Sequence, residues 1–226
     1  MASLCDYLCC KITTNRGGIF DIIHAKSDIM KQTDEVIAEI ALVIYPDCQL
    51  SAVYGLTDLF SLAGQWANRD EMGLKTRAIS VSHWRMDDDE MTCTYDSRDG
   101  QPHHITHVIV PPSLVYPEKM QSMKVAANWM LNHHKQGVTL ASVCAGAFVL
   151  AETGLIDHRQ ATTHWAFAET LAKRFPNVQV AAQNMVIDDG DILTAGGILA
   201  WADLGLTIVA KLLGPSVMLA TARFLL

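Results

Sequence analysis

The chain has 226 residues, with 17 Lys and Arg against 24 Asp and Glu, and a formal net charge of −7 at pH 7. Half of the residues are hydrophobic and 18% are charged, a composition that suits one well-buried core, alone or with an appendage. No run of about 18 apolar residues is present, so we expect no membrane partner. The negative charge argues against this segment holding a DNA backbone itself, because that contact needs clustered Lys and Arg.

The first eleven residues lack the basic region and the unbroken apolar stretch of a secretory signal. We therefore expect a cytoplasmic protein whose thiols are reduced. The six cysteines are Cys5, Cys9, Cys10, Cys48, Cys93 and Cys144. They form no C-x-x-C pair, which argues against a structural zinc site. His103 and His104 would point in opposite directions in an extended chain, and His133-His134 near a helix end would favour the helix dipole when charged. We predict neither a metal nor a cofactor.

Residues 1–38 are predicted to be an N-terminal extension. They hold three of the six cysteines and one plausible helix, from Ser27 or Asp28 to about Ala38. Cloning-derived sequence, a native extension and a dimer arm are all compatible with this stretch. The folded domain is expected to occupy residues 39–226.

From Glu39 onward, predicted strands alternate with predicted helices. Short apolar runs predict strands at 40–45, 74–81, 91–95, 107–110, 138–143, 178–182, 185–187 and 192–193. Apolar residues at helical spacing predict helices at 51–66, 120–134, 145–153, 166–175, 198–213 and from about 215 to the end. Alternation of this kind indicates an α/β fold, with a mostly parallel central sheet that helices cover on both faces.

The stretch from Thr139 to Ala147 carries the most specific signal. An apolar strand runs into a helix through Ser142-x-Cys144-x-Gly146, with small residues on both sides of the cysteine. A nucleophile elbow needs this arrangement, because bulky neighbours would collide at its strained bend. The bend places the sulfur at a helix N-terminus, which is expected to lower the thiol pKa. A buried structural cysteine is the alternative.

His164, in the stretch from Ala161 to Trp165, is the natural partner for such a thiol. The alternative is that it donates or accepts a hydrogen bond at the start of the following helix. Trp165, next to it, is the tryptophan that we expect at the pocket.

Residues 143–155, followed by 161–165, resemble the PfpI/ThiJ-type class I glutamine amidotransferase-like superfamily. The branch they resemble most is the amidase-like sensor domain of AraC-type transcriptional regulators. Residues 189–197 and 200–204 are similar too, as are Tyr45-Pro46 and the stretch 55–60. The resemblance covers about residues 40–226. It implies a flavodoxin-like three-layer αβα sandwich, a cysteine at the elbow and a homodimer.

Catalytic members of this superfamily carry a carboxylate that touches the sulfur and a Pro-Gly-Gly loop that helps to form the oxyanion hole. Alignment on Gly55 and Phe60 puts the acid position on Ala52, with Ser51 beside it. The loop reads Pro111-Pro112-Ser113, and Pro112 has no N–H to donate. Losing one oxyanion donor lowers the rate of turnover by about 10²–10³. The missing acid lowers it by a further factor of about 10²–10⁴.

The resemblance and these departures together predict the ligand-sensing and dimerisation domain of an AraC-type regulator. DNA contact would require a helix-turn-helix module that this chain does not contain. Family analogy suggests a small nitrogenous metabolite as the ligand. The expected pocket residues are Cys144, Ala145, His164, Trp165, Ser113, Pro112, Ser51 and Ala52. The alternatives are a hydratase, amidase or glyoxalase-type enzyme with Cys144 and His164 catalytic, and a redox sensor acting through Cys144.

Overall fold

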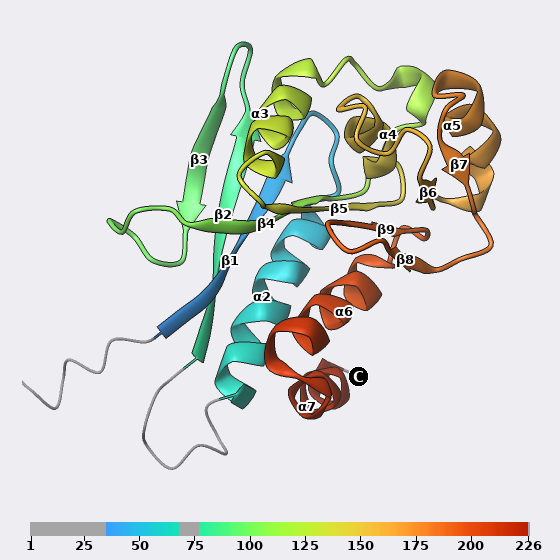
Figure 1. Cartoon of the computed structure of the whole chain (residues 1–226). Coiled ribbons are helices and arrows are strands. Elements are labelled where there is room, and N and C mark those ends of the chain that lie inside the picture. The colour runs from blue at the N-terminus through green and yellow to red at the C-terminus, as the bar shows by residue number, and fades with distance from the viewer. Residues whose placement is uncertain (1–34, 68–76, 226) are drawn as a thin grey trace, which may run out of the picture. The chain divides into compact units, whose positions relative to one another are not determined.

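The structure, a computed structural model, describes residues 35–67 and 77–225 (Figure 1). Within these residues a seven-stranded sheet has the order β3-β2-β1-β4-β5-β9-β8. The strands are β1 (Glu35–Ile44), β2 (Arg77–Met86), β3 (Met91–Asp96), β4 (Ile105–Val110), β5 (Thr139–Val143), β8 (Val186–Asp188) and β9 (Ile192–Ala195). All neighbours pair in parallel except the two edge strands, β3 and β8, which are antiparallel to β2 and β9. The mostly parallel sheet expected from the sequence is confirmed.

Helices cover both faces of this sheet, which completes the three-layer sandwich (Figure 1). One layer holds α2 (Leu50–Ala67), α6 (Trp201–Leu213) and α7 (Pro215–Leu225). The other holds α3 (Lys124–His134) and α4 (Gly146–Ala151), with α5 (Ala168–Arg174) beside α4. Short 3-10 turns η1 (Pro117–Lys119) and η2 (Trp165–Phe167) precede α3 and α5. Within the described residues, no helix is long and apolar enough to cross a membrane.

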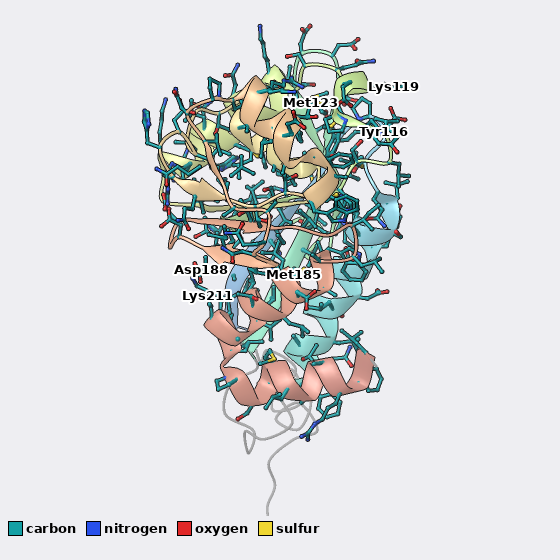
Figure 2. The ribbon with its side chains drawn as sticks, turned by 90° about the vertical axis from the view of Figure 1, so that its right-hand side faces the viewer. Tyr116, Lys119, Met123, Met185, Asp188 and Lys211 are labelled. Atoms are coloured by element: carbon teal, nitrogen blue, oxygen red, sulfur yellow. The ribbon has the colours of Figure 1, made fainter. Side chains whose placement is uncertain are left out.

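The sheet is apolar because both of its faces are covered. Fully buried side chains of the core include Ile40, Leu42, Ile109 and Leu140 from the strands and Phe60, Met130 and Phe148 from the helices. At one edge, the ammonium of Lys211 in α6 lies 2.6 Å from the carboxylate of Asp188 and ties this helix to the β8–β9 hairpin (Figure 2).

The chain order creates a natural ligand-binding edge. From β1 the chain crosses through α2 to β2 on one side, whereas from β4 it crosses through α3 to β5 on the other. Right-handed crossovers in opposite directions put α2 and α3 on opposite faces. The loops after β1 and β4 therefore diverge at a switch point, the place where open α/β sheets bind ligands.

Three sequence expectations need correction. The helix expected to reach Ala38 does not do so, because residues 35–38 already belong to β1, which pairs with β2 from its first residue; its part up to residue 34 lies outside the described residues. The strand expected at 178–182 does not join the main sheet. Its core, β7 (Gln179–Val180), pairs instead with β6 (Gln160–Ala161) in a separate two-stranded sheet. Third, the strand expected at 74–81 runs on to Met86, and residues 74–76 lie outside the described residues.

Candidate functional site

Cys144 occupies a strained bend between β5 and α4. Its φ angle is +56°, in the left-handed region that side chains other than glycine seldom adopt. Gly146 makes this bend possible, since a Cβ there would lie 2.6 Å from the carbonyl oxygen of Val110 and 2.7 Å from that of Pro111. The Ser-x-Cys-x-Gly pattern thus reflects a close approach of the elbow to the end of β4.

Two hydrogen bonds fix the backbone of the elbow. The N–H of Cys144 donates to the carbonyl oxygen of Ala195 at 2.8 Å. The hydroxyl of Thr163, itself fully buried, donates to the carbonyl oxygen of Cys144 at 2.7 Å. The preceding Thr162 anchors the same segment, because its N–H donates to the hydroxyl of Thr194 at 2.9 Å. The two threonines before His164 therefore serve to hold the bend in place.

The thiol of Cys144 is buried, with a relative exposure of 1%. Burial raises its pKa to about 11, and a hydrogen bond from the Ala145 backbone only partly opposes this. The lowered pKa expected from the sequence is therefore wrong. The physical reason is that α4 has only six residues, so its small dipole does not outweigh the cost of placing a thiolate away from water.

Tyr45, in the loop after β1, lies beside the elbow. Its hydroxyl donates to the carbonyl oxygen of Pro111 at 2.7 Å. Its pKa is raised well above the usual value, first by burial and then by negative charge on Cys48 and Cys144, which lie close enough to act on it. From the sequence, Tyr45 was part of the family resemblance only, and no role at the site was predicted for it.

Gln49 is a second residue for which the sequence predicted no role at the site. Its N–H donates to the carbonyl oxygen of Pro112 at 2.7 Å, which joins the loop before α2 to the loop after β4. Its side-chain oxygen Oε1 is buried and has no hydrogen-bond partner within the described residues. The available signal was its position directly before α2, three residues ahead of Ala52.

The other expected pocket residues lie in the first turn of α2, in the loop after β4 and at the elbow. Ala52 is fully buried and offers no carboxylate, whereas Ser51 beside it is exposed. Pro112 and Ser113 are buried, and the Ser113 hydroxyl accepts a hydrogen bond from the N–H of Val115 at 3.2 Å. Ala145 is also fully buried and follows the sulfur directly.

His164 is the cap residue before η2, and Trp165 is the first residue of η2. The Nδ1 atom of His164 accepts a hydrogen bond from the N–H of Ala166 at 3.2 Å, and its ring centre lies 5.1 Å from that of Phe167. Trp165 is 77% exposed. Among the hydrogen bonds of the described residues, none joins His164 to Cys144. This geometry matches the alternative weighed for His164, a hydrogen bond at the start of the following helix.

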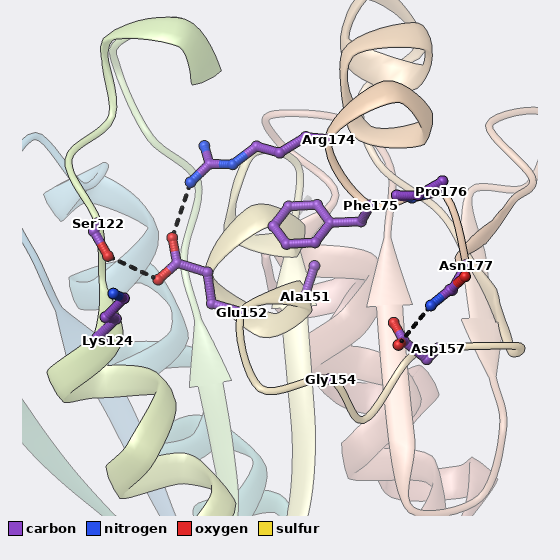
Figure 3. Close-up of a pocket in the computed structure, with 10 residues that line it drawn as sticks. All are labelled: Ser122, Lys124, Ala151, Glu152, Gly154, Asp157, Arg174, Phe175, Pro176 and Asn177. Atoms are coloured by element: carbon purple, nitrogen blue, oxygen red, sulfur yellow. Dashed lines mark hydrogen bonds and ion pairs between the residues drawn. The ribbon is translucent and has the colours of Figure 1, made fainter.

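Cys144 lines neither of two surface cavities that described residues form. One, of about 480 Å³, lies between α3, α4 and α5 (Figure 3). The other, of about 520 Å³, lies at the ends of β1 and β2, where Pro46, Met86 and Lys124 line it. Within the same residues, no three His, Cys, Asp or Glu side chains gather as metal ligands would. His103, for example, pairs with the buried carboxylate of Glu39 at 2.7 Å.

The family model that matches this sequence decides its membership. The model of the DJ-1/PfpI family matches residues 54–211. The chain belongs to the DJ-1/PfpI family. The resemblance stated from the residues around Cys144 is thereby confirmed, together with the flavodoxin-like fold.

Curated members similar to this DJ-1/PfpI chain include regulators and an enzyme. The HTH-type transcriptional regulator CdhR of Pseudomonas aeruginosa is 38% identical over 87 residues, which are 38% of this chain and 26% of the regulator. The HTH-type transcriptional regulator GlxA of Rhizobium meliloti is 38% identical over 78 residues, 34% of this chain and 24% of that protein. The isonitrile hydratase of Pseudomonas putida is 38% identical over 76 residues, 33% of this chain and 32% of the enzyme. The matched segments thus span a third or less of these relatives.

Solved structures show the same DJ-1/PfpI fold at low identity. A putative transcriptional regulator from Vibrio parahaemolyticus aligns with a TM-score of 0.64 and 16% identity over 84% of this chain and 99% of that one. An AraC family regulator from Pseudomonas putida aligns with a TM-score of 0.60 and 16% identity over 84% of this chain and all of that one. DJ-1beta of Drosophila melanogaster aligns with a TM-score of 0.61 and 17% identity over 83% of this chain and 97% of that one. The chain is therefore a DJ-1/PfpI domain with the fold of these structures, and HTH-type transcriptional regulators are among the proteins similar to it in sequence.

Proposed function

We propose that this domain binds a small metabolite beside the elbow and acts as the ligand-sensing, dimerising part of an AraC-type regulator. The main support for this proposal is that the Cys144 thiol is protonated at neutral pH. At pH 7 a thiol with a pKa of about 11 is ionised in roughly one molecule in ten thousand. With Ala52 at the acid position, the elbow offers no carboxylate to take the proton.

The two loops beside the elbow support binding rather than turnover. The carbonyl oxygens of Pro111 and Pro112 are engaged by Tyr45 and Gln49, which locks the loops together. Pro112 contributes no N–H to an oxyanion hole. The Oε1 atom of Gln49 is a buried acceptor without a partner among the described residues, and the N–H of a bound nitrogenous ligand would donate a hydrogen bond to it.

The regulator relatives support the wider role. Each is an HTH-type regulator of which the matched segment is about a quarter, so DNA binding in this proposal belongs to a helix-turn-helix module outside this chain. The proposal includes that the protein is a homodimer and is located in the cytoplasm. Sedimentation of the purified domain tests the dimer, and a monomer at micromolar concentration would contradict that part.

Turnover assays test the central part of the proposal. The domain is incubated with a small isonitrile, with acetamide and with methylglyoxal, as native chain and as the Cys144→Ala variant. The Cys93→Ala variant, which removes a cysteine in the edge strand β3, is the matched control. We expect no cysteine-dependent turnover of any of the three. Turnover that disappears in Cys144→Ala and persists in Cys93→Ala would overturn the sensor proposal.

That outcome would support the second candidate, a cysteine-dependent hydratase. The match to an isonitrile hydratase and the intact elbow at Cys144 favour it. It would require the sulfur to become accessible and ionised when substrate binds. A redox role for Cys144 meets the same obstacle, because oxidation proceeds through an exposed thiolate.

A further inference from the structure

The cavity between α3, α4 and α5 is a candidate site apart from the elbow. Its volume of about 480 Å³ lies in the range of small-molecule sites. None of the residues assigned above to the elbow site lines it. Figure 3 shows its charged side chains gathered on two opposite sides, with apolar side chains between them.

One side of the cavity carries a spare positive charge. The carboxylate of Glu152 is occupied, because it accepts hydrogen bonds from the N–H of Met123 at 2.9 Å and from Ser122 at 3.3 Å, and pairs with Arg174 at 3.0 Å. This leaves the exposed ammonium of Lys124 with no ion-pair partner among the described residues. Lys124 is also the first residue of the eleven-residue helix α3, whose N-terminus adds to the positive potential.

The opposite side carries a spare negative charge. One oxygen of Asp157 accepts a hydrogen bond from the side-chain amide of Asn177 at 3.1 Å. No cationic side chain pairs with this carboxylate in the part of the chain that the structure describes. Between the two sides lie Ala151 and the half-buried ring of Phe175, which give the cavity an apolar middle, and Pro176 lies on the side of Asn177 (Figure 3).

We propose that this cavity binds a small zwitterion with an apolar segment between its two charges. Its carboxylate would pair with Lys124, its ammonium would pair with Asp157, and its methylene groups would lie on Phe175. A single anion or a single cation would satisfy only one side. The site is independent of the function proposed for the elbow.

Titration of the domain with 6-aminohexanoate, followed by calorimetry at low salt, tests this directly, since exposed charges are screened at high salt. Hexanoate and hexylamine each carry one of the two charges and are the matched ligand controls. We expect saturable binding of 6-aminohexanoate at one site, and binding of each control weaker by about tenfold or more. Shorter members of the ω-amino acid series then measure the separation that the cavity prefers.

Variants locate the site. Lys124→Met and Asp157→Asn should each weaken 6-aminohexanoate binding about tenfold, with thermal melting used to confirm that both fold. Lys119→Met, at an exposed lysine of η1 outside the cavity (Figure 2), should leave it unchanged, as should Cys144→Ala. Absence of binding, binding of hexanoate equal to that of 6-aminohexanoate, or binding that neither Lys124→Met nor Asp157→Asn weakens would overturn the proposal.

Discussion

The hydroxyl of Thr163 donates a 2.7 Å hydrogen bond to the carbonyl oxygen of Cys144, and both residues are buried. This bond connects the segment before His164 to the strained bend after β5. The threonines that precede His164 therefore have a structural role, which does not depend on catalysis. The elbow is therefore held by its surroundings, and several consequences can be measured.

Replacing Thr163 by valine keeps the side-chain shape and removes the donor. The Cys144 carbonyl then loses a buried partner, so we expect the free energy of unfolding to fall by about 1–3 kcal/mol. Denaturation in urea measures the change. Thr207→Val is the matched control, since its hydroxyl bonds the Asp203 carbonyl on an exposed helix face, and it should change stability by about 0.5 kcal/mol or less. Equal effects of the two variants would contradict the role given to Thr163.

Gly146→Ala should be strongly destabilising. The new Cβ would lie 2.6 Å from one backbone oxygen and 2.7 Å from another, and neither can move without shifting the end of β4. We expect a loss of about 3 kcal/mol or more, or failure to fold. Gly197→Ala is the control, because a Cβ there meets its nearest atom at 3.8 Å, an ordinary contact. A Gly146→Ala domain as stable as Gly197→Ala would show that the close approach is wrong.

Gln49→Met tests the unpartnered side-chain oxygen in the loop before α2. Methionine has a similar length and removes a buried acceptor that has no partner, so the ligand-free domain should gain stability by about 1 kcal/mol. Thermal and urea unfolding measure this. A loss of 1 kcal/mol or more in the variant would mean that Oε1 makes a stabilising hydrogen bond in the free domain, contrary to the binding role proposed for it.

Stability should depend on pH through Cys144. Its folded-state pKa of about 11 lies above the ordinary value of 9.0. As pH rises from about 9 to about 11, the unfolded chain releases this proton while the folded chain retains it, so stability is lost over that window and unaffected by this thiol below it. The difference in unfolding free energy between the native chain and Cys144→Ala should therefore shrink with rising pH, by up to about 2–3 kcal/mol. A difference that stays constant up to pH 10 would contradict the raised pKa.

The fold and the elbow could be predicted because their signals are local. Apolar runs such as residues 107–110 alternate with helical spacing, and Ser142-x-Cys144-x-Gly146 joins one element of each kind. Residues 35–38 were harder, since this short stretch suits either a helix end or the edge of a strand. Its pairing with β2, which lies far along the chain, decides the matter.

The chemistry of the site was less predictable because burial is a tertiary property. The sequence places Cys144 at a helix start, which favours the thiolate, but it does not reveal that the sulfur is almost completely buried. Gln49 was missed for a similar reason. Its buried, unpartnered oxygen becomes visible only when the loops after β1 and β4 are brought together.

The pH dependence of Cys144 alkylation tests the account most directly. The domain is treated with iodoacetamide between about pH 6 and pH 10, and modification of Cys144 is followed by mass spectrometry, with Cys93 as the internal control. Only the thiolate reacts, so a pKa of about 11 predicts a rate that is very low at pH 7 and still rising tenfold per unit at pH 10. Rapid alkylation of Cys144 with a midpoint at or below pH 7 would show an activated nucleophile and contradict the proposal that this elbow binds rather than reacts.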